Sequence, residues 1–118
     1  MKYFLILMIF FSFSCHAQTR IDPSQSKAYV GKSVTVCGKI YGSYQSLRSK
    51  GQPTFLDMGG KYPNATFTVL VWGDDLSKFD YSLNSLVEKT VCVTGLIKLY
   101  RDKPEIIVSD PSQIKITN

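Results

Sequence analysis

The sequence is poor in the side chains that enzymes most often use for covalent or acid–base catalysis. Its 118 residues include one histidine, His16, and three cysteines. The histidine lies in an N-terminal segment that we expect to be removed, which leaves no Ser/His or Cys/His pair. Two cysteines without a histidine also form a poor zinc ligand set. We therefore predict a protein that is not an enzyme, with no metal site and no cofactor.

Long apolar runs are equally scarce, and the one present lies at the N-terminus. Lys2 precedes the apolar run 3–13, and Cys15-His16-Ala17 provides small residues at positions −3 and −1 of a cleavage site. This pattern is typical of a secretory signal peptide, and the run is shorter than the ~20 residues of a membrane-spanning helix. We predict a signal peptide over 1–17 and one domain over 18–118, exported to the periplasm or secreted, without stable membrane insertion. The alternative is a lipoprotein anchored through Cys15.

Removal of the signal peptide leaves the charge almost unchanged but makes the cysteine count even. Of the 14 Lys and Arg residues only Lys2 is lost, so 13 remain against 9 Asp and Glu, a net charge of +4. Cys37 and Cys92 remain, and an even number of cysteines in an exported domain indicates a disulfide. The alternative is two buried free thiols.

Two stretches that contain these cysteines alternate apolar and polar residues. They are residues 32–41, KSVTVCGKIY, and residues 90–97, TVCVTGLI. A period of two in β-branched residues predicts half-buried β-strands. In both strands the cysteine lies on the face opposite the valines. Cys37 would therefore face Cys92 if the two strands pair.

The rest of the mature chain predicts further strands and one short helix. Strands are expected at 54–58, 66–72 and 104–109, with a polar connection over 42–53 and an extended edge at Ile114 and Ile116. Leu76, Phe79, Leu83 and Leu86 have helical spacing, so a helix is expected to run from Asp74 or Asp75, as its cap, to about Val87. Asp-Pro-Ser-Gln occurs twice, at 22–25 and 110–113. We interpret both copies as capping or turn motifs, with Ser24 capping a short turn through Ala28.

The predicted order is three strands, a helix and a two-strand hairpin. This is the order of the OB-fold, an all-β, five-stranded Greek-key barrel with a helix between strands three and four. In that barrel the first and fourth strands are neighbours, which independently places Cys37 near Cys92. The inward faces predict a core of Val34, Val36, Ile40, Leu56, Met58, Phe67, Val69, Val71, Val91, Val93, Ile97 and Ile106, closed at one end by Leu83 or Leu86.

Several segments also resemble the OB-fold nucleic-acid-binding domains of bacteria, among them small exported OB domains and OB modules that accompany secreted or surface nucleases. The resemblance covers about residues 28–116. It is carried by residues 31–40 (GKSVTVCGKI), 54–59 (TFLDMG), 67–72 (FTVLVW), 95–100 (GLIKLY) and 104–107 (PEII). It implies an OB-fold and a nucleic-acid ligand. We recognise no nuclease domain in the sequence, so no catalytic activity is carried over.

The expected binding site follows from where OB-folds hold oligonucleotides, which is the face of strands two and three between the 1–2 and 4–5 loops. Binding a single strand requires cations along a groove and aromatic faces for base stacking. Residues of these types at the expected places are Tyr44, Arg48, Lys50, Phe55, Lys61, Tyr62, Trp72, Lys98, Tyr100, Arg101 and Lys103. The partner is then single-stranded DNA or RNA. The alternative is an exported module that binds another protein or a glycan, in which the basic loops are merely solvated and Phe55 or Trp72 covers the barrel.

Overall fold

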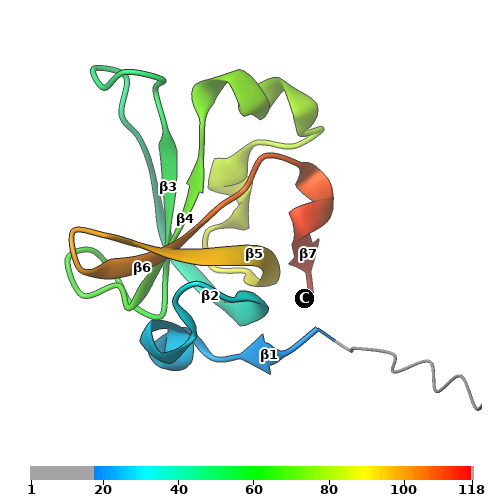
Figure 1. Cartoon of the computed structure of the whole chain (residues 1–118). Helices are drawn as coiled ribbons and strands as arrows, with labels where there is room; N and C mark the ends of the chain where they lie inside the picture. The colour runs from blue at the N-terminus through cyan, green and yellow to red at the C-terminus, as the bar shows by residue number, and fades with distance from the viewer. Residues whose placement is uncertain (1–17, 118) are drawn as a thin grey trace, which may run out of the picture.

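The computed structural model describes residues 18–117, so the predicted signal peptide lies outside the described residues. The described chain consists of β-strands and short 3-10 helices (Figure 1). The strands are β1 (Arg20–Ile21), β2 (Ser33–Gln45), β3 (Thr54–Met58), β4 (Phe67–Val71), β5 (Thr90–Tyr100), β6 (Lys103–Ile107) and β7 (Ile114–Ile116). The 3-10 helices are η1 (Pro23–Tyr29), η2 (Gly73–Lys78), η3 (Leu83–Leu86) and η4 (Pro111–Gln113).

Five of the strands form a closed ring. The sheet order is β1-β2-β3-β4-β6-β5-β7, and an additional β2–β5 pairing brings the ends of the five-strand path together. Most neighbours are antiparallel, whereas β4 and β6 run parallel. The long strand β2 pairs with β5 through its first half and with β3 through its second half, on either side of a β-bulge between Ile40 and Gly42. A bulge bends and twists a strand, which allows β2 to close the ring.

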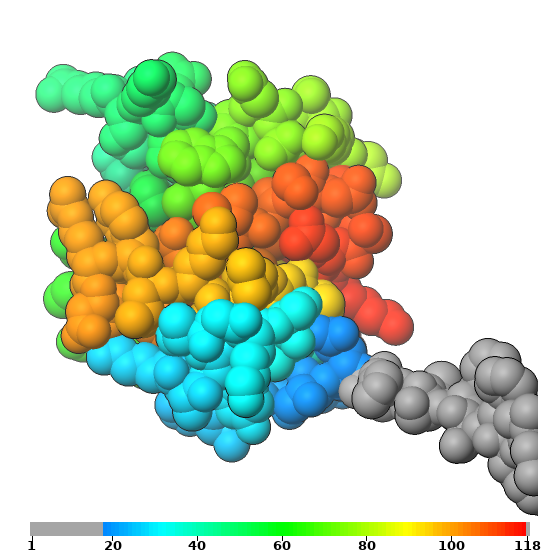
Figure 2. Space-filling view, in the orientation of Figure 1, coloured from blue at the N-terminus to red at the C-terminus, as the bar shows by residue number. Residues whose placement is uncertain are grey.

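The inside of the ring is the predicted core. All twelve strand residues assigned to it are at most 2% exposed, and both Leu83 and Leu86 join them. Alternation therefore assigned the faces of every main strand correctly. The ring is covered at two opposite places, by η2 and η3 on one side and by η1 on the other (Figure 1). Figure 2 shows η1 and the start of β2, in blue and cyan, packed along β5, in yellow and orange.

The disulfide between Cys37 and Cys92 is confirmed. The two residues are direct partners in the antiparallel β2–β5 register, and their sulfur atoms are bonded at 2.06 Å. The link joins residues 55 positions apart. It lies on the outer face of the ring, opposite the valines of the core, as the alternation predicted.

The single helix predicted to run to about Val87 is wrong. Two 3-10 helices, η2 and η3, occupy this stretch, and extended residues separate them. The apolar spacing is used as expected, because Phe79, Leu83 and Leu86 are buried. Ser, Asn and Asp compete for backbone hydrogen bonds and disfavour a continuous α-helix, so the segment folds as two short turns instead.

The predicted caps need a related correction. Asp22, not Ser24, caps η1, and its backbone N–H donates to Gln25 at 2.9 Å to complete a capping box. The second Asp-Pro-Ser-Gln copy forms the same box around η4. The cap position of η2 is Trp72 and no side chain caps it, so the predicted roles of Asp74 and Asp75 as caps are wrong. Asp75 instead pairs with Lys78 at 2.8 Å.

Strands β1 and β2 also differ from the prediction. β2 continues through Gln45, so the connection to β3 is shorter than the predicted 42–53. The two-residue strand β1 pairs parallel with β2 and was not predicted, because two residues show no period. β7 confirms the edge expected at Ile114 and Ile116. Among residues 18–117 no helix is long and apolar enough to cross a membrane.

Candidate nucleic-acid interface

A groove of about 870 Å³ crosses the outer face of β2, β3, β4 and β6. The β3–β4 turn and the tip of the β5–β6 hairpin extend beside one another and frame it (Figure 1). Seven of the eleven predicted site residues line this groove: Tyr44, Phe55, Lys61, Tyr62, Tyr100, Arg101 and Lys103. Sequence reasoning missed Tyr41, Gly42, Ser43, Asp57, Ala65, Thr68 and Glu105, which complete the lining.

Aromatic rings form the walls of the groove. Tyr44, Tyr62 and Tyr100 are each more than half exposed, whereas Tyr41 and Phe55 are half-buried. Tyr44 and Phe55 are cross-strand partners in the β2–β3 register, so their rings share one face of the sheet. Exposed rings that gather around one groove are unusual on a soluble protein and indicate a surface that receives a partner.

The cations of the groove lie beside these rings. The ammonium of Lys103 is 6.0 Å from the ring centre of Tyr62 and donates a hydrogen bond to the carbonyl of Pro63 at 3.2 Å. The guanidinium of Arg101 lies 5.3 Å from the ring centre of Tyr100. Cation–π contacts of this kind hold the charges next to the aromatic faces, so a ligand would meet both in the same place.

Arg101 occupies a backbone conformation that arginine rarely adopts. Arg101 and Asp102 are the two central residues of the β5–β6 hairpin, with φ of 49° and 65°. Two-residue hairpin turns of this type favour Asn and Gly, which tolerate positive φ. An arginine at this position keeps a cation at the mouth of the groove at the expense of backbone strain.

Two carboxylates lie on the floor of the groove. Asp57, Thr68 and Glu105 are neighbours in one row across β3, β4 and β6. Glu105 is only 8% exposed. Burial raises the pKa of both carboxyls above their ordinary values, and the positive charges of Lys103 near Asp57 and Lys98 near Glu105 partly oppose this shift. The floor is therefore acidic while the rim is basic.

The raised pKa values predict how these two carboxyls affect stability. A carboxyl whose pKa is higher in the folded than in the unfolded protein binds its proton more tightly after folding, so stability rises as the pH falls through the folded pKa. We expect Asp57→Asn with Glu105→Gln to raise the Tm at neutral pH and to lose this advantage progressively as the pH is lowered. Thermal unfolding followed by circular dichroism from neutral to acidic pH measures the effect.

The informative quantity is the difference in Tm between the variant and wild type at each pH. Other carboxyls change the stability of both proteins with pH in the opposite direction. Hydrogen bonds from Lys39 and Ser112 lower the pKa of Glu88 and Asp110 respectively, so their contributions are lost on acidification. A Tm gain that stayed constant down to acidic pH would contradict the role given to Asp57 and Glu105.

Four of the predicted site residues do not line the groove: Arg48, Lys50, Trp72 and Lys98. Trp72 is 40% exposed, and its ring packs against Gly51, where an added Cβ would come within 2.9 Å of the ring. The backbone N–H of Gly73 donates to the carbonyl of Gly51 at 2.8 Å. Trp72 therefore holds the 46–53 loop against the barrel. Lys98 pairs in register with Glu105 beside the groove.

The missed residues had one usable signal in the sequence. The alternation that places Leu56 and Met58 in the core places Asp57 on the outer face of the same strand, so a complete list of outward-facing positions would have included it. Glu105 and Thr68 meet Asp57 only because β4 and β6 are parallel neighbours, which follows from the ring and not from local pattern. Among residues 18–117 no three His, Cys, Asp or Glu side chains gather closely enough to hold a metal ion.

Comparison with solved structures identifies the class of fold. The chain matches the crystal structure of yeast Stn1 and Ten1 with a TM-score of 0.57 and 16% identity over 88% of this chain and 65% of the other. An OBody bound to hen egg-white lysozyme matches with a TM-score of 0.57 and 19% identity over 89% and 99% of the two chains. A putative aspartyl-tRNA synthetase from Leishmania major Friedlin matches with a TM-score of 0.54 and 13% identity over 89% of this chain and 22% of the synthetase.

These likenesses, together with the five-strand ring, establish an OB-like fold. The chain spans about two thirds of the yeast chain and about a fifth of the synthetase. No family model matches the sequence, and no curated protein matches it. At these identities the comparisons show the fold alone, and the function has to be argued from the groove.

Proposed function

We propose that this protein is an exported OB-fold binding module, without catalytic activity, that binds single-stranded nucleic acid in the groove on the outer face of β2, β3, β4 and β6. Export is supported by the N-terminal sequence pattern and by the Cys37–Cys92 disulfide, since such bonds persist in oxidising compartments. The OB-like fold supports a binding role, because OB-folds bind oligonucleotides on this face.

The observation that carries the proposal is the alternation of exposed rings and cations along one groove. Tyr62 with Lys103 and Tyr100 with Arg101 form two such pairs on its rim. Single-strand binders use aromatic faces to stack bases and adjacent cations to contact the backbone, with each stacked base contributing about 1–3 kcal/mol. The groove offers both kinds of contact at the same place.

The acidic floor indicates which part of the ligand lies deepest. Phosphates would be repelled by Asp57 and Glu105, so they belong at the basic rim. Base edges carry N–H donors that a carboxylate accepts, and splayed single strands expose these edges. We therefore orient the strand with its bases toward the floor and its backbone toward Lys61, Arg101 and Lys103.

The test is a fluorescence-anisotropy titration of the purified protein with single-stranded DNA and RNA of about 12 nucleotides, within the site size of OB-folds. Three phosphate contacts predict that log K falls with log salt with a slope of about −2. Arg101→Asn suits the turn conformation, so we expect a fold at least as stable as wild type. Its binding should weaken about tenfold through loss of a charge-assisted contact, with the slope reduced by about 0.7.

Tyr44→Ala should behave differently, because it removes a stacking surface and no charge. We expect at least a fivefold loss of affinity with an unchanged salt slope. Lys115→Asn on β7 makes the same change of charge as Arg101→Asn but lies outside the groove, and serves as the control. Equal losses in Arg101→Asn and Lys115→Asn would show that only net charge matters. Absence of wild-type binding at low salt would overturn the proposal.

The alternative function is that of an exported module that binds a protein or a glycan. A specific observation in its favour is the match to an OBody bound to hen egg-white lysozyme, an OB-like chain that binds a protein. The two carboxylates in the groove are compatible with this reading as well. A module of this second kind would not bind the oligonucleotides even at low salt, so the titration with single-stranded DNA and RNA separates the two functions.

A further inference from the structure

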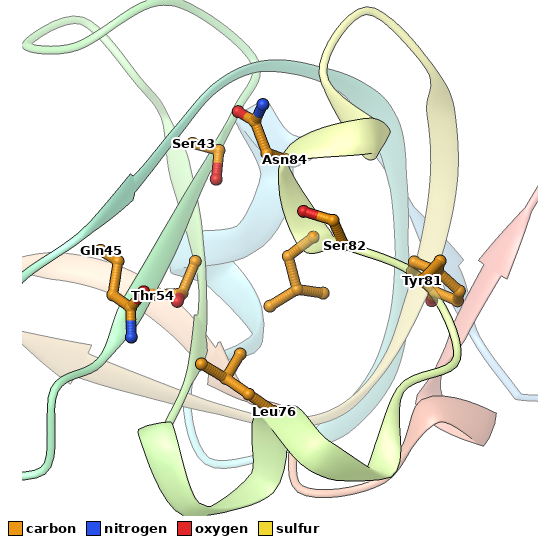
Figure 3. A pocket seen from close by; sticks show the side chains of 8 residues that line it. Ser43, Gln45, Thr54, Leu76, Tyr81, Ser82 and Asn84 are labelled. Atoms are coloured by element: carbon orange, nitrogen blue, oxygen red, sulfur yellow. The ribbon is translucent and has the colours of Figure 1, made fainter.

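A second cavity, of about 320 Å³, lies where η2 and η3 cover the ring. Residues 73–86, which contain η2 and η3, form the covering segment. Figure 3 shows Ser43, Gln45 and Thr54 on one side of the cavity. Around the rest lie Leu76, Tyr81, Ser82 and Asn84 of the covering segment. Its volume is near the lower end of small-molecule sites, which span about 300–1,000 Å³. It would accept a single ring rather than a polymer.

The cavity exists because the predicted helix does not form. η2 and η3 replace it as two short turns, and the extended residues between them bring Tyr81 and Ser82 to the cavity. Leu83 and Leu86 still fill the ring below. The covering segment is therefore hydrophobic where it faces the core, and it brings both polar and apolar side chains to the cavity.

The hydroxyl of Thr54 borders this space and has no hydrogen-bond partner among the described residues. Thr54 is only 5% exposed and lines the cavity, yet its hydroxyl makes no hydrogen bond with any of the residues that the structure describes. The hydroxyl of Ser43 on β2, which also lines the cavity, is likewise unpaired within the described chain. No buried side-chain oxygen or nitrogen of the described residues lacks a partner, so both hydroxyls remain accessible from the cavity. They are therefore free to hydrogen-bond a ligand that enters it.

The lining contains no charged side chain, which limits the ligand class. Hydroxyls and the amides of Gln45 and Asn84 both donate and accept hydrogen bonds. Burial, together with the nearby charge of Asp80, raises the pKa of Tyr81, so its phenol stays neutral. Leu76 and the ring of Tyr81 add apolar surface. A neutral ring with hydroxyls at its edge and C–H groups on its face matches this combination.

We propose that this cavity is a second binding site, separate from the groove, that takes a neutral sugar ring. Thr54 and Ser43 hydrogen-bond the sugar hydroxyls from the ring of strands, and Ser82 and Asn84 do so from the covering segment. The proposal does not depend on nucleic-acid binding, because the cavity shares only Ser43 with the groove lining.

The test is a ¹H–¹⁵N NMR titration of the purified, disulfide-bonded protein with glucose and N-acetylglucosamine, up to about 50 mM, because one small ring binds in the millimolar range. We expect saturable shifts at the amides of Ser43, Thr54, Ser82 and Asn84. Glucosamine and glucuronate, which carry a charge into an uncharged cavity, should bind at least fivefold more weakly.

Thr54→Val keeps the shape of the side chain and removes its hydroxyl, so sugar affinity should fall about fivefold. Thr68→Val makes the same change on β4 in the groove and should leave sugar binding unchanged. If Thr54→Val does not fold, Ser82→Trp at an exposed position blocks the cavity and should abolish the shifts. Lack of saturable shifts in wild type, shifts centred on the groove tyrosines, or unchanged affinity in the variant that folds would overturn the proposal.

Discussion

Val69→Asp is expected to abolish folding. Val69 is fully buried at the centre of β4, between Leu56 of β3 and Ile106 of β6. An unpaired carboxylate at this position would lose its hydration without gaining a partner, at a cost of several kcal/mol. That cost is comparable with the whole stability of a small domain, about 5–15 kcal/mol. Circular dichroism and thermal unfolding should show neither the native spectrum nor a cooperative transition.

The matched control for this substitution is Leu96→Asp on β5. Leu96 is also an apolar residue in a strand of the ring but faces solvent. Its replacement should change the free energy of unfolding by no more than about 0.5 kcal/mol, as is usual for surface substitutions. The Tm should therefore stay close to that of wild type. Normal unfolding of Val69→Asp would show that the faces of β4 are assigned wrongly. Loss of folding in both variants would show instead that the strands tolerate no added charge.

Reduction of the Cys37–Cys92 disulfide has the second large expected effect. Closure of a loop of 55 residues restricts the unfolded chain, and the chain-entropy relation gives about 4 kcal/mol for this length. For a domain of this size, that loss lowers the Tm by roughly 15–30 °C. Thermal unfolding of the oxidised protein with and without a reductant compares identical side chains, so the difference isolates the bond.

A variant with both cysteines replaced by serine is the control for the reductant itself. It should unfold near the Tm of the reduced wild type and should not respond to reductant. Non-reducing peptide mapping should recover the two cysteines in one linked pair. Two alkylatable thiols in the natively folded protein would contradict the disulfide directly.

The β-strands were predictable because each main strand turns one face to the core and the other away from it. This arrangement produces a period of two in the sequence, as in Leu56 and Met58 on one face of β3 against Phe55 and Asp57 on the other. The pairing of Cys37 with Cys92 was predictable because two constraints, strand face and strand order, agreed on it. β1 could not be predicted, because a strand of two residues is too short to show an alternation of apolar and polar positions.

In the covering segment, the type of helix could not be predicted from the sequence. Spacing of Leu76, Phe79, Leu83 and Leu86 identifies which residues pack against the core, but α-helical and successive 3-10 turns satisfy the same spacing. The choice depends on backbone hydrogen bonds for which short polar side chains compete, as the hydroxyl of Ser85 does by donating to the carbonyl of Ser82 at 2.6 Å. The position of the cavity therefore could not be predicted, because it depends on this choice.

The sequence placed some of the candidate site residues correctly and others not. Residues on the hairpin tip, such as Arg101 and Lys103, were placed correctly because the turn follows from the strands on either side. Trp72 was assigned to the outer face of β4, but its ring lies under the 46–53 loop. Contacts between a loop and a sheet depend on the path of the loop, which no local periodicity encodes.

The covalent link between β2 and β5 also determines what a protease could do to this molecule. The 46–53 loop is largely exposed, and it lies within the stretch that the disulfide encloses. A single cleavage there would produce two fragments that remain bonded through Cys37 and Cys92. The nicked protein would migrate as one species without reductant and as two with it. All strands of the ring would still be tethered together, so a cut in this exposed loop need not release either fragment.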